Sequence, residues 1–144
     1  GFDPTFRVNP RDNISVDLNA TTISAQYDDF FSGGVSLAGN TPRNIPEKTA
    51  NLWVNWAPLD RLQLAAGVRY VDSRFGNDGN TRTLPSYRVI DASINWTLSE
   101  NTEILFRAKN LTDEDNYVLS EYVGNQWVFG DPRAYELSVR FSVL

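Results

Sequence analysis

The chain has 144 residues, of which 41% are hydrophobic and 22% charged, a composition typical of a folded domain rather than a disordered one. It contains no histidine and no cysteine, which excludes disulfides, thiolate nucleophiles and the usual zinc and haem ligands. The net charge of -5 argues against nucleic acid as a partner, and no apolar run reaches the roughly 18 residues that a transmembrane helix needs.

The predicted elements of the first half are strands, because apolar and polar residues alternate with a period of two. The alternation is weak in "FDPTFRV", near the start, and clear in "NISVDLNAT", "TANLWVNWA" and "RLQLAAGVRYV". The apolar faces of these three clear segments comprise Ile14, Val16, Leu18 and Ala20, then Ala50, Leu52, Val54 and Trp56, then Leu62, Leu64, Ala66, Val68 and Tyr70.

The second half continues the pattern in "VIDASINWTL", more weakly in "TEILFRAKNL", and again in "AYELSVRFSVL". The apolar faces comprise Ile90, Ala92, Ile94, Trp96 and Leu98, then Ile104, Phe106 and Ala108, then Tyr135, Leu137, Val139, Phe141 and Val143. No helical period competes with this alternation. The sequence therefore predicts an all-β fold, an antiparallel up-and-down meander of about seven strands.

The connections between these strands alternate in length. Short turns are predicted at "NPRDN", "PLD" and "SEN", whereas long polar loops are predicted at about 31–46, 72–86 and 112–132. Short turns at one end of a sheet and long loops at the other are typical of an outer-membrane barrel. The connections thus predict that the meander is part of a transmembrane β-barrel.

Aromatic residues agree with this interpretation. Trp56, Trp96 and Phe141 are expected near the short turns, and Tyr70 and Tyr135 near the long loops, all on apolar faces. Two such bands predict membrane girdles, in which case the apolar rows would face lipid and the opposite rows a polar lumen. The alternative is that the same aromatics fill the core of a soluble β-sandwich or small barrel that binds a small ligand.

Four stretches in one order resemble the carboxyl-terminal part of a TonB-dependent outer-membrane receptor of the ferric-siderophore type. They are "NIPEKTANLWVNW", "GVRYVDSRFGNDGNTRTLPSYRVIDASINW", "RAKNLTDEDNY" and "FGDPRAYELSVRFSVL". The resemblance implies a barrel of about 22 strands around a plug, in the bacterial outer membrane. It also implies a ferric siderophore or a similar scarce nutrient as the transported ligand, and outer-membrane lipid as a partner.

The chain departs from the family pattern, and residues 1–144 are expected to be one segment of such a barrel without its plug. TonB would then act only through an amino-terminal region that these residues lack. The end of the chain at Leu144 departs from the aromatic last residue usual in such barrels. Gly1 is expected to be a boundary within a longer chain, and the isolated segment is expected to self-associate through its apolar face and unpaired edges.

Candidate ligand contacts lie in the long loops. The loop at 112–132 is unusually aromatic, and Tyr117, Tyr122 and Trp127 are predicted to contact a ligand unless they pack together to shape the loop. Arg74 and Arg82 are predicted to attract an anionic ferric chelate unless they pair with nearby carboxylates.

No other constellation of residues indicates catalysis or a cofactor. The acidic run Asp113, Glu114 and Asp115 lacks the spacing of a calcium loop, so a solvated loop is expected rather than a metal site. No nucleophile elbow of the "GxSxG" type occurs. The sequence predicts a receptor and not an enzyme, with no cofactor.

Overall fold

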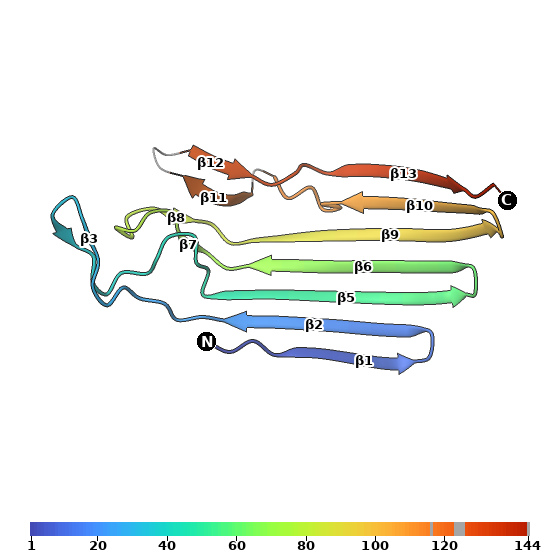
Figure 1. Ribbon diagram of the computed structural model, residues 1–144, viewed down its shortest axis with the longest axis horizontal. Coiled ribbons are helices and arrows are strands. Elements are labelled where there is room, and N and C mark those ends of the chain that lie inside the picture. Colours follow the sequence, from blue (N-terminus) through green and yellow to red (C-terminus); the bar gives the residue numbers. More distant parts are fainter. Residues whose placement is uncertain (116, 123–125, 144) are drawn as a thin grey trace.

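The long strands form one antiparallel sheet. The computed structural model describes residues 1–115, 117–122 and 126–143. Seven long strands lie side by side in the order β1-β2-β5-β6-β9-β10-β13, so each long strand pairs with the next long strand along the chain (Figure 1). Their bounds are β1 (Thr5–Arg11), β2 (Ile14–Thr22), β5 (Lys48–Leu59), β6 (Leu62–Val71), β9 (Tyr87–Ser99), β10 (Thr102–Lys109) and β13 (Ala134–Phe141). The predicted seven-stranded meander is confirmed.

The long connections contain short hairpins that the sequence pattern did not predict. These are β3 (Phe31–Ser32) with β4 (Val35–Ser36), β7 (Arg74–Phe75) with β8 (Thr83–Leu84), and β11 (Val118–Tyr122) with β12 (Gln126–Phe129). The three connections run from 23 to 47, from 72 to 86 and from 110 to 133, and we call them the first, second and third connections. The first is longer than predicted, because β2 ends at Thr22. Over the described ranges, no helix is long and apolar enough to cross a membrane.

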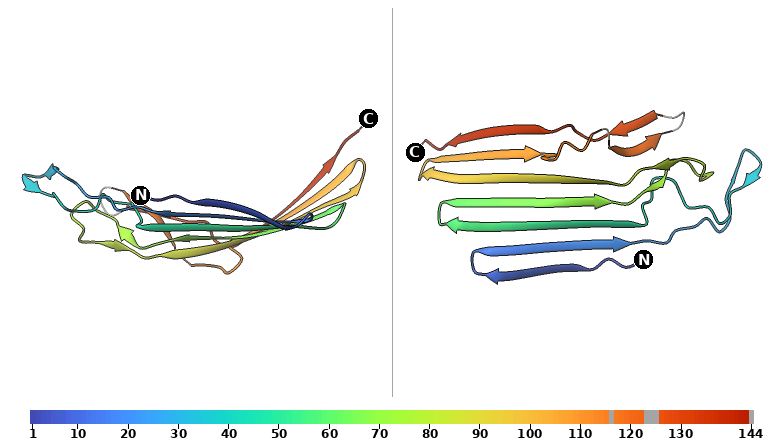
Figure 2. Two further views of the ribbon diagram at one scale, coloured as in Figure 1. Left: turned by 90° about the horizontal axis from the view of Figure 1, so that it is seen from below. Right: turned by 180° about the vertical axis from the view of Figure 1, so that it is seen from behind.

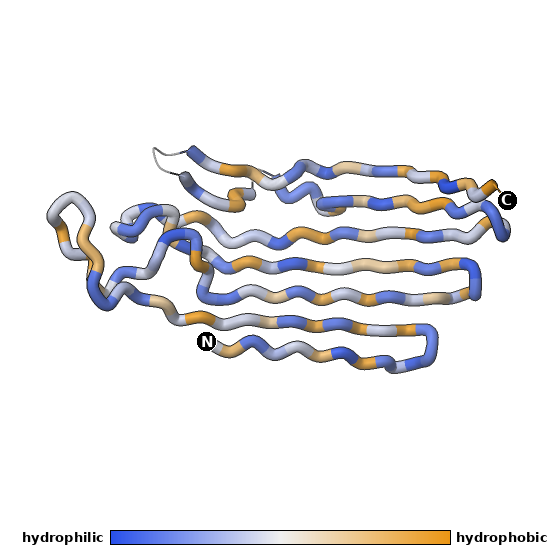
Figure 3. Tube along the Cα trace, in the orientation of Figure 1, coloured by the Kyte–Doolittle hydropathy of each residue, from blue (hydrophilic) through white to orange (hydrophobic). Residues whose placement is uncertain are grey.

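The strand register aligns the apolar rows across the sheet. Leu18 pairs with Leu52, Leu52 with Val68, and Val68 with Ile90. One position along, Asn19 pairs with Asn51 and Asn51 with Arg69. Figure 3 shows the resulting alternation of hydrophobic and hydrophilic residues along each long strand. One face of the sheet is therefore apolar and the other polar, as the alternation predicts.

The apolar face is not covered by any described part of the chain. Large apolar side chains on it, such as Leu137, Val139 and Phe141, are exposed, and Figure 2 shows a curved, open sheet with β1 and β13 at its edges. Buried apolar residues gather instead near the long connections, in a cluster of Tyr87, Val89 and Tyr117. The alternative of a soluble domain with a closed apolar core is therefore wrong for this arrangement.

Trp53 is an exception on the polar face, and a glycine explains its place there. Trp53 lies directly opposite Gly67 in the register of β5 and β6. A Cβ atom added to Gly67 would lie 2.6 Å from Cε2 and 2.7 Å from Cε3 of the indole. The ring therefore lies against the bare backbone of Gly67, a cross-strand arrangement that only glycine permits.

Substitution of Gly67 by alanine is expected to lower the free energy of unfolding by about 2 kcal/mol, because the added methyl group overlaps the indole of Trp53. Denaturant unfolding followed by tryptophan fluorescence measures this change. Gly79→Ala is the matched control, since its Cβ would meet Asn77 at an ordinary 3.5 Å. Equal effects of the two substitutions would contradict the packing argument, and Trp53→Ala should abolish the penalty at Gly67.

Candidate functional site

The three long connections lie together at one end of the sheet, opposite the short turns (Figure 1). This end also holds the most deeply buried residues of the described part of the chain, including Leu84, Val118 and Asn110. Loops that carry buried, hydrogen-bonded groups of their own form a defined surface rather than a loose fringe. This end is therefore the candidate functional site.

Polar contacts join the first and second connections. The Tyr27 hydroxyl donates to Asp78 Oδ1 at 2.8 Å, and this hydrogen bond raises the pKa of Tyr27. Asn80 donates through Nδ2 to the Thr41 carbonyl at 2.7 Å, and its Oδ1 accepts from the Thr41 amide at 2.8 Å. The Asn80 side chain thus pairs with Thr41 as a strand neighbour would, and it fastens the two connections together.

Arg74 joins the second connection to the third. It is only 5% exposed, and its Nη2 donates to the carbonyls of Val118 at 2.5 Å and Leu119 at 2.8 Å. Its guanidinium carbon lies 5.6 Å from the centre of the Tyr87 ring, within the range of a cation–π contact. Burial lowers the pKa of Arg74. The guanidinium holds backbone carbonyls, so it does not face outward toward a ligand.

Glu121, on β11, contacts both of the other connections. The residue is 2% exposed, and its Oε1 lies 2.5 Å from Arg82 Nη2 in the second connection. Its backbone amide donates to Asn44 Oδ1 at 3.0 Å, and its carbonyl accepts from Asn44 Nδ2 at 3.1 Å. Sequence reasoning missed Glu121, because Asn44 lies 77 residues away along the chain and no local pattern links them.

Asn110 organises the start of the third connection. Its side chain donates to the carbonyls of Glu114 and Asp131 and accepts from the Glu114 amide at 2.8 Å. Its own amide donates to Asp91 Oδ1 at 2.8 Å, and its φ of 48° lies in the left-handed region that asparagine tolerates. The buried Asn110 side chain therefore holds the two ends of this connection together, and the Asn110 backbone amide attaches them to β9.

The β11–β12 hairpin presents aromatic side chains to solvent. Tyr122 is 63% exposed and Trp127 is 50% exposed, with Phe129 beside Trp127 at a ring-centre distance of 6.2 Å. Tyr117 instead packs beneath the hairpin against Tyr87, at a ring-centre distance of 4.9 Å, and burial raises its pKa. The sequence allowed these aromatics either to contact a ligand or to pack together within the loop. Tyr117 packs and shapes the loop, whereas Tyr122 and Trp127 are available for contact.

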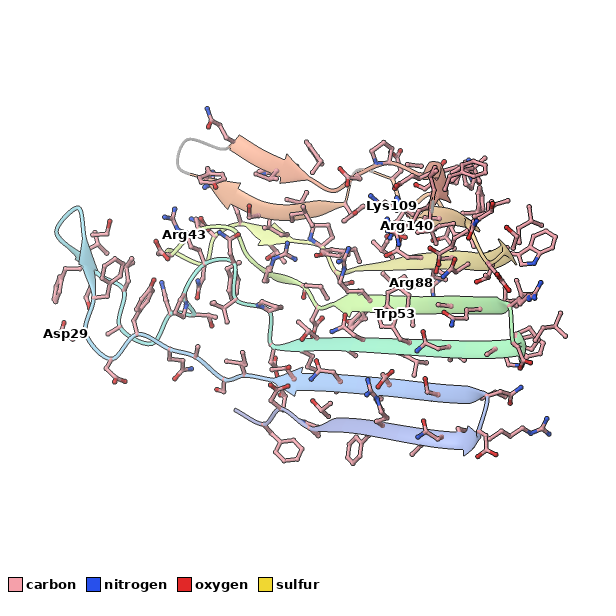
Figure 4. All side chains as sticks on the ribbon, turned by 45° about the vertical axis from the view of Figure 1, so that its right-hand side comes forward. Asp29, Arg43, Trp53, Arg88, Lys109 and Arg140 are labelled. Atoms are coloured by element: carbon pink, nitrogen blue, oxygen red, sulfur yellow. The ribbon has the colours of Figure 1, made fainter. Side chains whose placement is uncertain are left out.

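The polar face of the sheet is hollowed next to the third connection. A pocket of about 350 Å³ is lined by residues that include Trp53, Arg69, Arg107, Lys109 and Asp91. Figure 4 labels Trp53 on β5 and Lys109 on β10. Arg107 lies 3.6 Å from a carboxylate on β13, whereas Arg69 and Lys109 form no ion pair with any described residue. An aromatic ring with nearby cations suits an anionic or aromatic ligand group.

The structure thus separates the predicted ligand contacts. Tyr122 and Trp127 are exposed, and the Arg82 side chain is 40% exposed beside Glu121. Arg74 and Tyr117 are largely buried at the loop end, although Tyr117 also forms part of the wall of the pocket beside Trp53. A long-range hydrogen-bond network decides these positions, so residue type alone did not separate the two groups.

The predicted girdle residues lie on the apolar face. Phe141 pairs with Thr102, the first residue of β10, and therefore lies beside a short turn. Trp96 pairs with Leu62, the first residue of β6, and also lies beside a short turn. Tyr70 and Tyr135 lie at the opposite end, near the long connections, and Trp56 shares the turn end with Trp96. All five side chains are exposed: Trp56, Tyr70, Trp96, Tyr135 and Phe141.

The acidic run 113–115 lies on the surface at the start of the third connection. Asp113 Oδ2 is 3.1 Å from Arg133 Nη2, and Asp113 also accepts from the Arg133 amide. Asp113 thus helps to close the connection on itself. Among the residues that the structure describes, no cluster of three acidic, histidine or cysteine side chains is placed to hold a metal ion.

Residues 5–111 match the family described as "TonB dependent receptor-like, beta-barrel". The probable TonB-dependent siderophore receptor PiuA of Acinetobacter baumannii is 30% identical over 103 residues, which are 72% of this chain and 14% of that protein. The ferrioxamine receptor of Yersinia enterocolitica is 26% identical over 147 residues, covering 98% of this chain and 20% of that protein. The chain therefore spans a fifth or less of the length of these relatives.

A solved structure shows the same arrangement of strands. The crystal structure of the siderophore receptor PiuA from Acinetobacter baumannii superposes with a TM-score of 0.83 at 23% identity, over 95% of this chain and 20% of that one. The similarity at this identity concerns the fold. The superposition indicates that the open, curved sheet corresponds to one portion of a larger β-barrel.

Proposed function

The chain belongs to the TonB-dependent receptors, as part of their β-barrel, and on this premise we propose that it forms the ligand-facing wall of a ferric-siderophore uptake receptor. TonB-dependent receptors are β-barrels of the bacterial outer membrane, so the outer membrane is the location of the chain. The observation that carries the siderophore assignment is the exposed aromatic hairpin β11–β12 at the loop end, on a scaffold whose relatives are named as siderophore receptors.

The proposed mechanism is binding and transport without covalent chemistry. Tyr122 and Trp127 would make the first contact with a ferric chelate, and the exposed part of Arg82, whose charge Glu121 offsets, would supply a further hydrogen-bond donor. The pocket next to Trp53, Arg69 and Lys109 lies further along the polar face and would receive the ligand as it enters the lumen. None of these steps requires a catalytic residue, which supports a receptor rather than an enzyme.

Lipid and TonB are the further partners in this proposal. The exposed apolar face would contact the hydrocarbon of the outer membrane, with Trp56 and Trp96 in one interfacial band and Tyr70 and Tyr135 in the other. TonB would engage a part of the receptor other than residues 1–144. The isolated chain would self-associate in water, because its apolar face and its two edge strands have no partner within the described residues.

The experiment that tests the ligand assignment compares Trp127→Ala and Tyr122→Ala in the whole receptor, with ferrioxamine and a ferric tris-catecholate as probes. Each substitution is expected to weaken binding of the preferred probe about tenfold, because an exposed aromatic contact with the ligand is lost. Phe31→Ala is the control, since Phe31 is an exposed aromatic on a different hairpin, β3–β4. Unchanged affinity in both variants, or binding of neither probe by the parent receptor, would contradict the proposal.

A further inference from the structure

Glu121 is the point at which the three connections meet. Its side chain is fully buried, with 0% of its surface exposed. Burying a carboxylate is costly unless charged or polar partners surround it, so its partners must be in place before the site is stable. The carboxylate pairs with Arg82 of the second connection, whereas the Glu121 backbone is bonded by the side chain of Asn44, a residue of the first connection.

Asn44 holds the backbone of Glu121 from both sides and is itself fixed. Its side chain pairs with the amide and the carbonyl of Glu121, as a neighbouring strand would. Its own amide donates to the Phe75 carbonyl at 2.7 Å, and its φ of 61° lies in the left-handed region. The first connection is therefore bonded to the second and to the third through this single residue.

Gly76 makes room for the Glu121 carboxylate. A Cβ atom on Gly76 would overlap Glu121 Oε2 and would lie 3.0 Å from its Cδ. The Gly76 amide donates to the Arg82 carbonyl at 2.9 Å, which sets the position of Arg82 for its contact with Oε1. We call Glu121, Asn44, Arg82 and Gly76 the Glu121 cluster.

The Glu121 cluster lies next to an exposed aromatic residue. Glu121 pairs directly with Trp127 in the register of the β11–β12 hairpin. Directly opposed residues on antiparallel strands have neighbouring side chains, so the position of one constrains the other. On the far side, Arg74 holds the carbonyls of Val118 and Leu119 and fixes the start of the same hairpin.

We propose that Glu121 is a positioning residue that joins the three connections into one rigid unit through Asn44 and Arg82, and so fixes how Trp127 is presented to the ligand. The joining of the connections follows from the contacts alone. The role of Trp127 rests on the proposed receptor function. The two parts are therefore tested by different measurements.

Hydrogen exchange in the whole receptor, without ligand, tests the joining of the connections. Glu121→Gln keeps the shape of the side chain and removes its charge. It is expected to accelerate exchange of the Asn44 and Gly76 amides at least about tenfold, because loss of the ion pair lets the connections open locally. Amides of β5 and β6 should be unchanged. Glu114→Gln, the same substitution at another glutamate of the third connection, is the control.

The result that would overturn the joining is faster exchange confined to β11 and β12. Two further variants approach the cluster from the other connections. Asn44→Asp removes the donor to the Glu121 carbonyl, and Gly76→Ala places a methyl group against Oε2. Both are expected to give the exchange pattern of Glu121→Gln, and a pattern confined to the connection that carries the substitution would contradict a single unit.

A double-mutant cycle tests the presentation of Trp127. Affinity for ferrioxamine or the ferric tris-catecholate is compared in Glu121→Gln, Trp127→Ala and the double variant. If Glu121 acts through Trp127, the double variant should bind no more than about twofold more weakly than Trp127→Ala alone. Fully additive losses would overturn the positioning role. If the parent receptor binds neither probe, the proposed function fails, and hydrogen exchange still decides whether the connections are joined.

Discussion

Replacement of Asn110 by alanine is expected to lower the free energy of unfolding by about 3 kcal/mol. The asparagine side chain is almost fully buried, with 1% of the residue exposed, and it satisfies the carbonyls of Glu114 and Asp131 and the amide of Glu114. Alanine would leave those three backbone groups without their partner at a site with little access to water. It would also have to adopt a φ of 48°, which its Cβ disfavours.

Asn110→Gly separates the two causes, because glycine adopts a positive φ readily but makes no side-chain hydrogen bond. Its cost is expected to be about 1 kcal/mol smaller than that of alanine. Equilibrium unfolding of the whole receptor in lipid vesicles measures both values. Asn101→Ala, at an exposed position in the short turn between β9 and β10, is the control and should change stability by less than about 0.5 kcal/mol. A similarly small change for Asn110→Ala would contradict the hydrogen-bond assignment.

Two adjacent residues of β5 are expected to differ strongly in how much stability is lost when each is replaced by arginine. Val54 lies on the apolar face between Val16 and Ala66, within the stretch that separates the two aromatic bands, whereas Asn55 lies on the polar face. Val54→Arg should destabilise the receptor in a bilayer by about 3 kcal/mol, because the guanidinium would enter hydrocarbon. Asn55→Arg should cost less than about 1 kcal/mol, since only its hydrogen bond to Ser15 is lost.

The measurement is the denaturant midpoint of each variant refolded into vesicles of one lipid composition. In a bilayer of shorter acyl chains, the penalty at Val54 should shrink, because its site lies nearer the polar headgroups. Equal penalties at the two positions would show that the apolar face does not contact lipid.

The alternation of side chains predicted the sheet well, because each long strand obeys one local rule. Even Leu105, which breaks the alternation of its segment, lies on the polar face opposite Asn95 and Ser138, as the pattern requires. Trp53 is a large aromatic residue on the polar face and so also departs from the alternation. The glycine at position 67, on the next predicted strand, was a sequence signal that this ring could be accommodated there. Local periodicity and turn residues therefore sufficed for the strands and for the ends at which the connections lie.

The loop end was less predictable, because its contacts join residues far apart in the chain. Arg74 carries a charge and lies in a loop, which suggested ligand contact, but its hydrogen-bond partners are carbonyls more than 40 residues away. Glu121 has no sequence feature that marks it as buried. Asn110 did carry a signal, since it follows a strand and precedes the turn-forming residues "LTD", where a left-handed residue is expected.

The pairing of each long strand with the next long strand along the chain has a consequence for assembly. Every pairing joins strands that follow one another along the chain, through a short turn or through one of the three connections, so the entropy lost when each new strand docks is kept low. The sheet can consequently grow one hairpin at a time, and each added strand covers the open hydrogen-bonding edge of the previous one. Such growth suits a protein that must enter a bilayer from one side, where an uncovered backbone edge is costly.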